Sequence, residues 1–147
     1  MSHEHTGNAW WDGFGRNEVN PDRLSSLAQW CEQLGPHDQR QGFDRILREI
    51  ADFGTEQEDA LKAAAIEWIA LLADSGAFES AAIAMIPRDA IFTGGRLKDG
   101  SFVAQVILDG GSGAHSREAG SLPMAWMAAL LRALARQSVE QKAATSH

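Results

Sequence analysis

The stretch that decides the fold runs from Ser101 to Leu134 and reads SFVAQVILDGGSGAHSREAGSLPMAWMAALLRAL. Its first eight residues alternate between two faces, which is the two-residue period of a strand. Its last thirteen repeat apolar side chains at helical spacing. A strand, a glycine-rich loop and a helix in this order predict an α+β fold. One strand face carries Phe102, Ala104, Val106 and Leu108, the other carries Val103 and Ile107, and the helix face carries Met124, Met127, Leu131 and Leu134.

A second strand is expected at 90–93, because Asp99-Gly100 is a favoured turn pair between two strands of a hairpin. A short apolar helix over 78–86 precedes it and is stopped by Pro87. The glycines of 109–113 indicate a flexible loop. The second half of the chain is thus predicted as a helix, a β-hairpin and a closing helix that ends near Gln137.

Three helices are expected before this module. Asn20-Pro21 is typical of a helix start, and Asp38 with Gln41 and Thr55 with Glu58 form two capping boxes. Gly76 ends the third helix. The apolar stripes are Leu24, Leu27, Cys31 and Leu34 in the first helix, Phe43, Ile46, Leu47, Ile50 and Phe53 in the second, and Leu61, Ala65, Trp68 and Leu72 in the third, with Ala64 and Leu71 beside them.

The predicted organisation has four parts, namely a flexible tail at 1–19, an acidic helical region at 20–76, an α+β module at 77–137 and a flexible tail at 138–147. A two-stranded hairpin cannot cover its faces and edges by itself. We therefore expect a homodimer through residues 90–136, in which two hairpins form a four-stranded sheet. The alternative is a monomer whose N-terminal tail or first helices cover the sheet.

Charge is uneven along the 147 residues. The net charge is −7, with 14 acidic and 6 basic residues in 1–76 and 6 acidic and 7 basic residues in 77–147. This balance makes direct nucleic-acid binding unlikely and favours a protein partner with a basic surface. No apolar run reaches the length of a membrane span, no signal peptide is visible, and Cys31 is the only cysteine. We therefore expect a cytoplasmic protein with no membrane association.

Two groups of residues are candidates for the partner-binding surface. Aromatic side chains in a polar tail are typical of interfaces, although they can also fold back onto their own domain. The acidic group can be functional or merely solvated. The candidates are Trp10, Trp11 and Phe14 in the tail, and Asp44, Glu49, Asp52, Glu56 and Asp59 around the second and third helices.

The glycine-rich loop is the alternative site, for a small molecule. Glycines can turn backbone N–H groups toward an anion, but the lysine of a Walker loop and the helix of a dinucleotide-binding loop are missing. A triad of adjacent serine, histidine and aspartate is equally unconvincing, because triad members normally converge from distant segments. We expect no enzyme activity, cofactor or metal. The residues of this alternative are Gly110, Gly111, Ser112, Gly113 and His115.

Residues 77–136 resemble the phage ABA sandwich domain. The matching residues are Ala81, Ala82, Ile86 and Pro87 at the front, and Pro123, Ala125, Leu131, Arg132 and Ala133 at the back; Ser80 stands where the family has aspartate. The resemblance implies an α/β/α layering, a phage or prophage setting and no catalytic residues. The resulting hypothesis is a small non-enzymatic accessory protein that occupies a host or phage protein. The alternative is a self-associating structural protein, because the predicted hairpin has uncovered edges.

Overall fold

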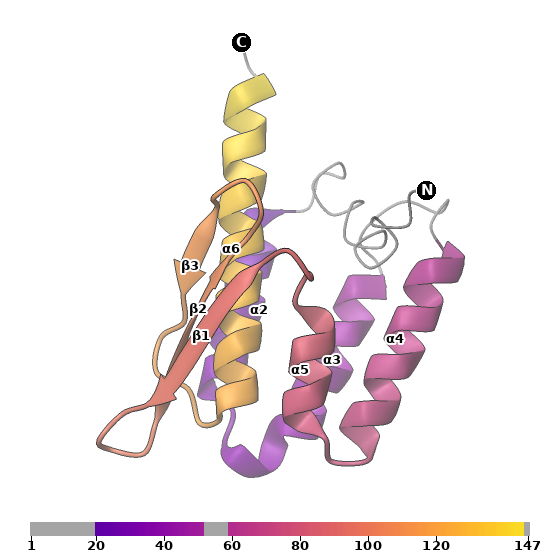
Figure 1. The fold of residues 1–147 in the computed structure, drawn as a ribbon, viewed down its shortest axis with the longest axis vertical. Coiled ribbons are helices and arrows are strands. Elements are labelled where there is room, and N and C mark those ends of the chain that lie inside the picture. Colours follow the sequence, from indigo (N-terminus) through magenta and orange to yellow (C-terminus); the bar gives the residue numbers. More distant parts are fainter. Residues whose placement is uncertain (1–19, 52–58, 146–147) are drawn as a thin grey trace.

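The computed structural model describes residues 20–51 and 59–145, and these residues form the predicted α+β fold (Figure 1). Five α-helices accompany one three-stranded sheet within the described ranges. The helices are α2 (Pro21–Gln33), α3 (Gln39–Ala51), α4 (Asp59–Asp74), α5 (Phe78–Met85) and α6 (Leu122–Thr145), and the strands are β1 (Ile91–Arg96), β2 (Phe102–Ile107) and β3 (Gly113–His115).

Helix α6 is the centre of the fold. The sheet packs on one side of it, α2 runs along another side, and α5 lies beside it (Figure 1). Residues 123–131 are buried around the whole circumference of the helix. A helix that is apolar on every side is stable in water only when it is surrounded in this way. The core therefore forms around α6, with α3 and α4 farther out.

The start of α2 agrees with the sequence pattern, and α3 begins close to its predicted position. The side chain of Asn20 accepts a hydrogen bond from the Asp22 N–H at 2.8 Å, which confirms the predicted N-cap of α2. Asp38 lies in a short 3-10 turn over Pro36–Asp38, and α3 begins one residue later. Phe43 and Ile46 are fully buried, as the stripe predicts. Thr55 and the turn around it lie outside the described residues.

The predicted core face of the third helix is partly wrong, because Ala65 and Leu72 pack against the core but Trp68 does not. Trp68 and Leu71 are 55% and 60% exposed, whereas Ile69 and Ala73 are buried. Helix α4 carries apolar residues on all sides, so its periodicity could not indicate which side faces α3 and α5. The side that turns inward carries Ile69 and Ala73, with Ala65 and Leu72 at its border.

The sheet has three antiparallel strands in the order β1-β2-β3 rather than the two predicted. Strand β1 extends through Gly94 and Gly95, beyond the predicted end at 93. Strand β3 begins at Gly113, the last residue of the predicted flexible loop, and continues through residues for which no strand was predicted. Gly110 and Gly111 have φ values of +96° and +100°, which make a tight turn that returns the chain along β2. The turn closes with the Leu108 N–H donating to the Ser112 carbonyl at 2.7 Å.

The helices lie on one face of the sheet (Figure 1). Ala104, Val106 and Leu108 are buried against α6, and the alternation along β2 confirms the two predicted faces. On the opposite face Ile91 is 65% exposed. The arrangement of the described residues therefore has two layers, unlike the α/β/α layering that the resemblance implies.

Helix α6 continues to Thr145, so the prediction of a flexible tail from 138 is wrong for residues 138–145. Arg136 and Glu140 form an ion pair at 3.1 Å, one helical turn apart. Glu140 also accepts a hydrogen bond from the Ser112 hydroxyl. These contacts hold the extension of α6 against the β2–β3 turn.

Candidate protein-interaction surface

The structure places only some of the predicted partner-binding residues. Trp10, Trp11, Phe14, Asp52 and Glu56 lie outside the described residues. Of the remaining acidic candidates, Asp59 is the first residue of α4, and Asp44 and Glu49 belong to α3.

Glu49 is largely neutralised within the fold. It accepts hydrogen bonds from Arg23 Nε at 2.9 Å and from Arg45 Nε at 3.3 Å, and its side chain is 19% exposed. Arg45 also stacks over the Trp30 ring, with 4.5 Å between the guanidinium carbon and the ring centroid. Asp44 is exposed. The α2–α3 surface thus carries internally compensated charge rather than a continuous acidic face.

The polar groups of the glycine-rich loop form hydrogen bonds within the fold and do not converge on a ligand site. The Gly113 carbonyl accepts a hydrogen bond from Arg136 Nη1 at 3.2 Å. The hydrogen bond from Ser112, followed by that from Arg136, holds the pKa of Glu140 below its ordinary value. Ser116 accepts a hydrogen bond from the buried Ala104 N–H at 2.9 Å. The two serine hydroxyls are therefore engaged away from His115, which lies opposite Gln105 on the exposed face of the sheet.

A shallow hollow of about 500 Å³ borders the β3 edge beside His115, Arg132 and Arg136. Both arginines already bind carboxylates. Arg136 pairs with Glu140, and Arg132 pairs with Glu32 of α2. The cationic wall of this hollow is therefore compensated, which weakens the small-molecule alternative for the loop.

The Glu32–Arg132 pair is a structural feature that the sequence analysis missed. Arg132 Nη2 and Nε donate to the two Glu32 oxygens at 2.6 and 3.0 Å, and the Arg117 N–H donates to Glu32 at 2.8 Å. The Glu32 side chain is 4% exposed. An arginine inside an apolar helix is a signal for such a partner, because a buried charge must be paired. The pair joins α2, α6 and the loop before α6.

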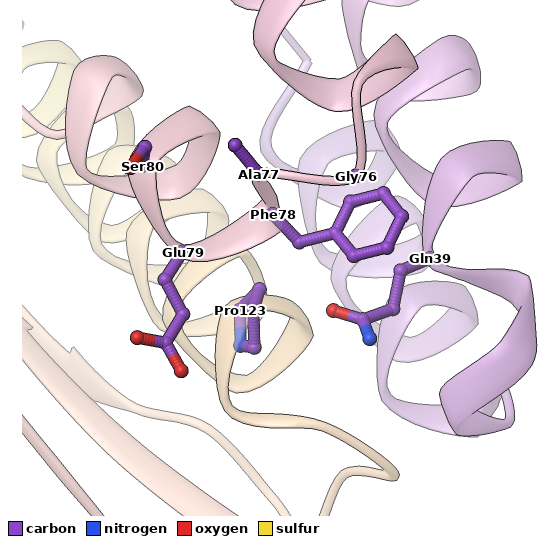
Figure 2. A pocket seen from close by; sticks show the side chains of 7 residues that line it. All are labelled: Gln39, Gly76, Ala77, Phe78, Glu79, Ser80 and Pro123. Carbon is purple, nitrogen blue, oxygen red and sulfur yellow. The ribbon is translucent and has the colours of Figure 1, made fainter.

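A second hollow, of about 330 Å³, lies where α3, α5 and α6 meet (Figure 2). Figure 2 shows the Gln39 amide and the Glu79 carboxylate on either side of Pro123. Gln39 Nε2 donates to the Pro36 carbonyl at 3.1 Å, and its buried Oε1 has no hydrogen-bond partner among the described residues. Buried acceptors of this kind are commonly satisfied by water. We interpret the hollow as a hydrated joint between helices.

Within the described ranges, helix α4 carries a group of exposed apolar side chains. Ala64, Trp68 and Leu71 are spaced by four and three residues, so they lie along one side of the helix. All three are exposed. Glu67 and Asp74 are exposed along one flank of the same side. We call these five residues the α4 outer face. Helix α4 lies at the border of the helical layer, with α3 and α5 against its other side (Figure 1).

Comparison with protein-family models, with curated protein sequences and with solved structures finds no match to this chain. The resemblance of residues 77–136 to the phage ABA sandwich domain therefore stays a prediction.

Proposed function

We propose that this chain is a non-enzymatic protein-binding module and that its α4 outer face contacts an apolar partner surface flanked by basic residues. The observation that carries the proposal is the exposure of Trp68 and Leu71, at 55% and 60%, on one side of α4. Large apolar side chains that are exposed side by side commonly mark interaction surfaces.

The composition of the face fits a partner contact. Tryptophan is enriched among the residues that dominate binding energy, because its large rigid ring buries much area at small entropic cost. The Trp68 and Leu71 side chains are not needed to close the core around α6. Their contribution is therefore available to a partner.

The charge of the face supports a basic partner. Glu67 and Asp74 lie along its flank, and the net charge of the chain is −7. Carboxylates around an apolar centre raise the association rate with a positively charged partner and disfavour acidic ones. The resemblance of residues 77–136 to the phage ABA sandwich domain adds a setting to this proposal. In that setting the chain is a phage or prophage accessory protein that occupies a host or phage protein in the cytoplasm. The single buried Cys31 is compatible with a reducing compartment.

Two synthetic amphipathic helices test the proposal. They share one leucine stripe, and one carries lysines beside the stripe while the other carries glutamates. We expect the lysine peptide to bind more tightly, with an affinity that falls as salt rises, and Trp68→Ser to weaken it at least about tenfold, or 1.4 kcal/mol. Isothermal titration calorimetry measures the affinity of the chain for each peptide.

The matched control is Val139→Ser, which removes a comparably exposed apolar side chain from α6. This variant should bind the lysine peptide as the wild-type chain does. Equal binding of the two peptides, or full binding by Trp68→Ser, would show that the α4 outer face is not the contact surface.

A further inference from the structure

Strand β1 has an open edge. It is the first strand in the order β1-β2-β3 and pairs with β2 alone among the described strands. The Leu97 N–H donates to the Ser101 carbonyl at 2.8 Å. Because hydrogen-bonded positions recur every second residue in an antiparallel pair, residues 91, 93 and 95 face β2. The backbone groups of Phe92, Gly94 and Arg96 point away from it.

The other edge of the sheet, at β3, is partly covered. At β3 the Gly113 carbonyl accepts a hydrogen bond from Arg136, and α6 packs along the strand. Strand β1 contains neither proline nor lysine, and its one charged residue is Arg96 at its end. Residues 91–95 thus lack the features that commonly block edge pairing, so this edge is suited to pairing with another strand.

We propose that β1 pairs in antiparallel fashion with β1 of a second copy of this chain, about a two-fold axis at Gly94, and that two sheets thereby form one of six strands. This surface is separate from the α4 outer face, so the inference goes beyond the proposed function. A two-fold contact requires a strand that is complementary to itself.

The backbone decides the register. With the axis at Gly94, all three outward residues find a partner, because Phe92 lies opposite Arg96 of the second copy, Gly94 lies opposite Gly94, and Arg96 lies opposite Phe92. Each such pair can exchange two hydrogen bonds. Moving the axis to Thr93 or to Gly95 leaves only two of the three outward residues paired. The Gly94 axis therefore satisfies the most backbone groups.

The exposed side chains support the same register. Ile91 is 65% exposed and Leu97 is 36% exposed on the face of the sheet away from α6. With the axis at Gly94, Ile91 of each copy lies opposite Leu97 of the other. Cross-strand apolar pairs stabilise a sheet. Ile91 at the start of β1 and Leu97 directly after its end thus cover each other across the dimer.

The charge within β1 favours the antiparallel direction. Arg96 is the one charged residue of the strand, and it is exposed. Antiparallel pairing about Gly94 places each Arg96 opposite Phe92 of the other copy. A parallel arrangement in register would instead bring the two Arg96 side chains together, which destabilises a strand pair.

Sedimentation equilibrium tests the assembly. We expect the wild-type chain to approach twice its monomer mass of 15.9 kDa as concentration rises into the micromolar range. Ile91→Lys places a charge opposite Leu97 and should shift the dissociation constant at least about tenfold. Val139→Lys is the matched control, because it adds the same charge at an exposed apolar site on α6, and it should leave the mass unchanged.

Disulfide crosslinking tests the register. The pair Ile91→Cys and Leu97→Cys in one chain should give a covalent dimer on mild oxidation, since residues facing each other at non-hydrogen-bonded positions have close Cβ atoms. Thr93→Cys alone and Gly95→Cys alone meet their own copies only when the axis shifts, so they should crosslink much more slowly. A mass of 15.9 kDa at every concentration, a dimer that survives Ile91→Lys, or faster crosslinking by either single variant contradicts the proposal.

Discussion

Helices α4 and α6 have similar apolar sequence patterns but differ in burial. Both carry apolar residues around most of their circumference, so neither has a clear polar side. Residues 123–131 of α6 are buried on all sides, because the sheet, α2 and α5 surround it. Among the residues that the structure describes, helix α4 has neighbours on its inner side alone, and Trp68 and Leu71 are exposed. Whether an apolar helix is buried therefore depends on the elements that pack around it. The exposed apolar side of α4 is a better candidate for a partner-binding surface than any side of α6 within residues 123–131.

The largest predicted effect is at the joint between α2 and α6. Replacing Glu32 with alanine leaves Arg132 partly buried without its carboxylate and removes the acceptor of the Arg117 N–H. Removing one partner of a buried ion pair typically costs about 3–5 kcal/mol of unfolding free energy. Urea denaturation measures the change. Glu118→Ala, an exposed carboxylate in the loop before α6, should stay within about 0.5 kcal/mol. Equal effects of the two variants would mean that the pair does not hold α2 to α6.

The second prediction compares one leucine on each helix. Leu130 of α6 is 1% exposed, and Leu130→Ala should lower the unfolding free energy by about 2–5 kcal/mol through loss of burial and formation of a cavity. Leu71→Ala on α4 should change it by no more than about 0.5 kcal/mol. Thermal and urea unfolding of both variants give the comparison directly. A large loss for Leu71→Ala would place that side chain in the core and contradict the α4 outer face.

A smaller effect is expected from Cys31, which is buried on the α2 side of the core. Burial, followed by the negative charge of Glu32, raises the pKa of its thiol from 9.0 to about 12. The folded state keeps the proton while the unfolded state loses it, so stability is fully present below pH 9 and declines between about pH 9 and 12. At pH 10 this group should lower the unfolding free energy by about 1.4 kcal/mol.

Urea denaturation of the wild-type chain and of Cys31→Ala at pH 7.5 and pH 10 checks this expectation. Subtracting the change in the alanine variant removes the contribution of other titrating groups. Rapid modification of the native wild-type chain by a thiol reagent at pH 8 would show that Cys31 is accessible, contrary to the structure.

Local signals predicted the parts of the fold that depend on local chemistry. Asn20 and Pro21 indicated the start of α2, because a cap and a fixed φ act within one helical turn. The alternation along β2 indicated its buried face, because one side of that strand is apolar throughout. The stripe of α3 was equally clear, since its other side is polar.

The parts that were missed depend on contacts between distant segments. Strand β3 has only three residues, and two glycines precede it, so nothing local distinguished it from a loop. The extension of α6 is supported by the Ser112–Glu140 hydrogen bond, which joins residues 28 apart. The charge of the acidic half could be counted, but the pairing of Glu49 with Arg23 depends on how α2 and α3 meet. Trp68 of the α4 outer face was predicted on the apolar stripe, with Ala64 and Leu71 beside it, and all three are exposed.

The Glu32–Arg132 pair has a consequence for biosynthesis. Its two residues are 100 positions apart, and α2 packs chiefly on α6. While the chain is being translated, α2 leaves the ribosome long before the helix that completes its burial. Its apolar side, with Leu24 and Leu27, must stay exposed or bind transiently elsewhere during that interval. Contacts of such long sequence separation also slow folding. The apolar side of α2 is therefore buried only after α6 emerges and docks.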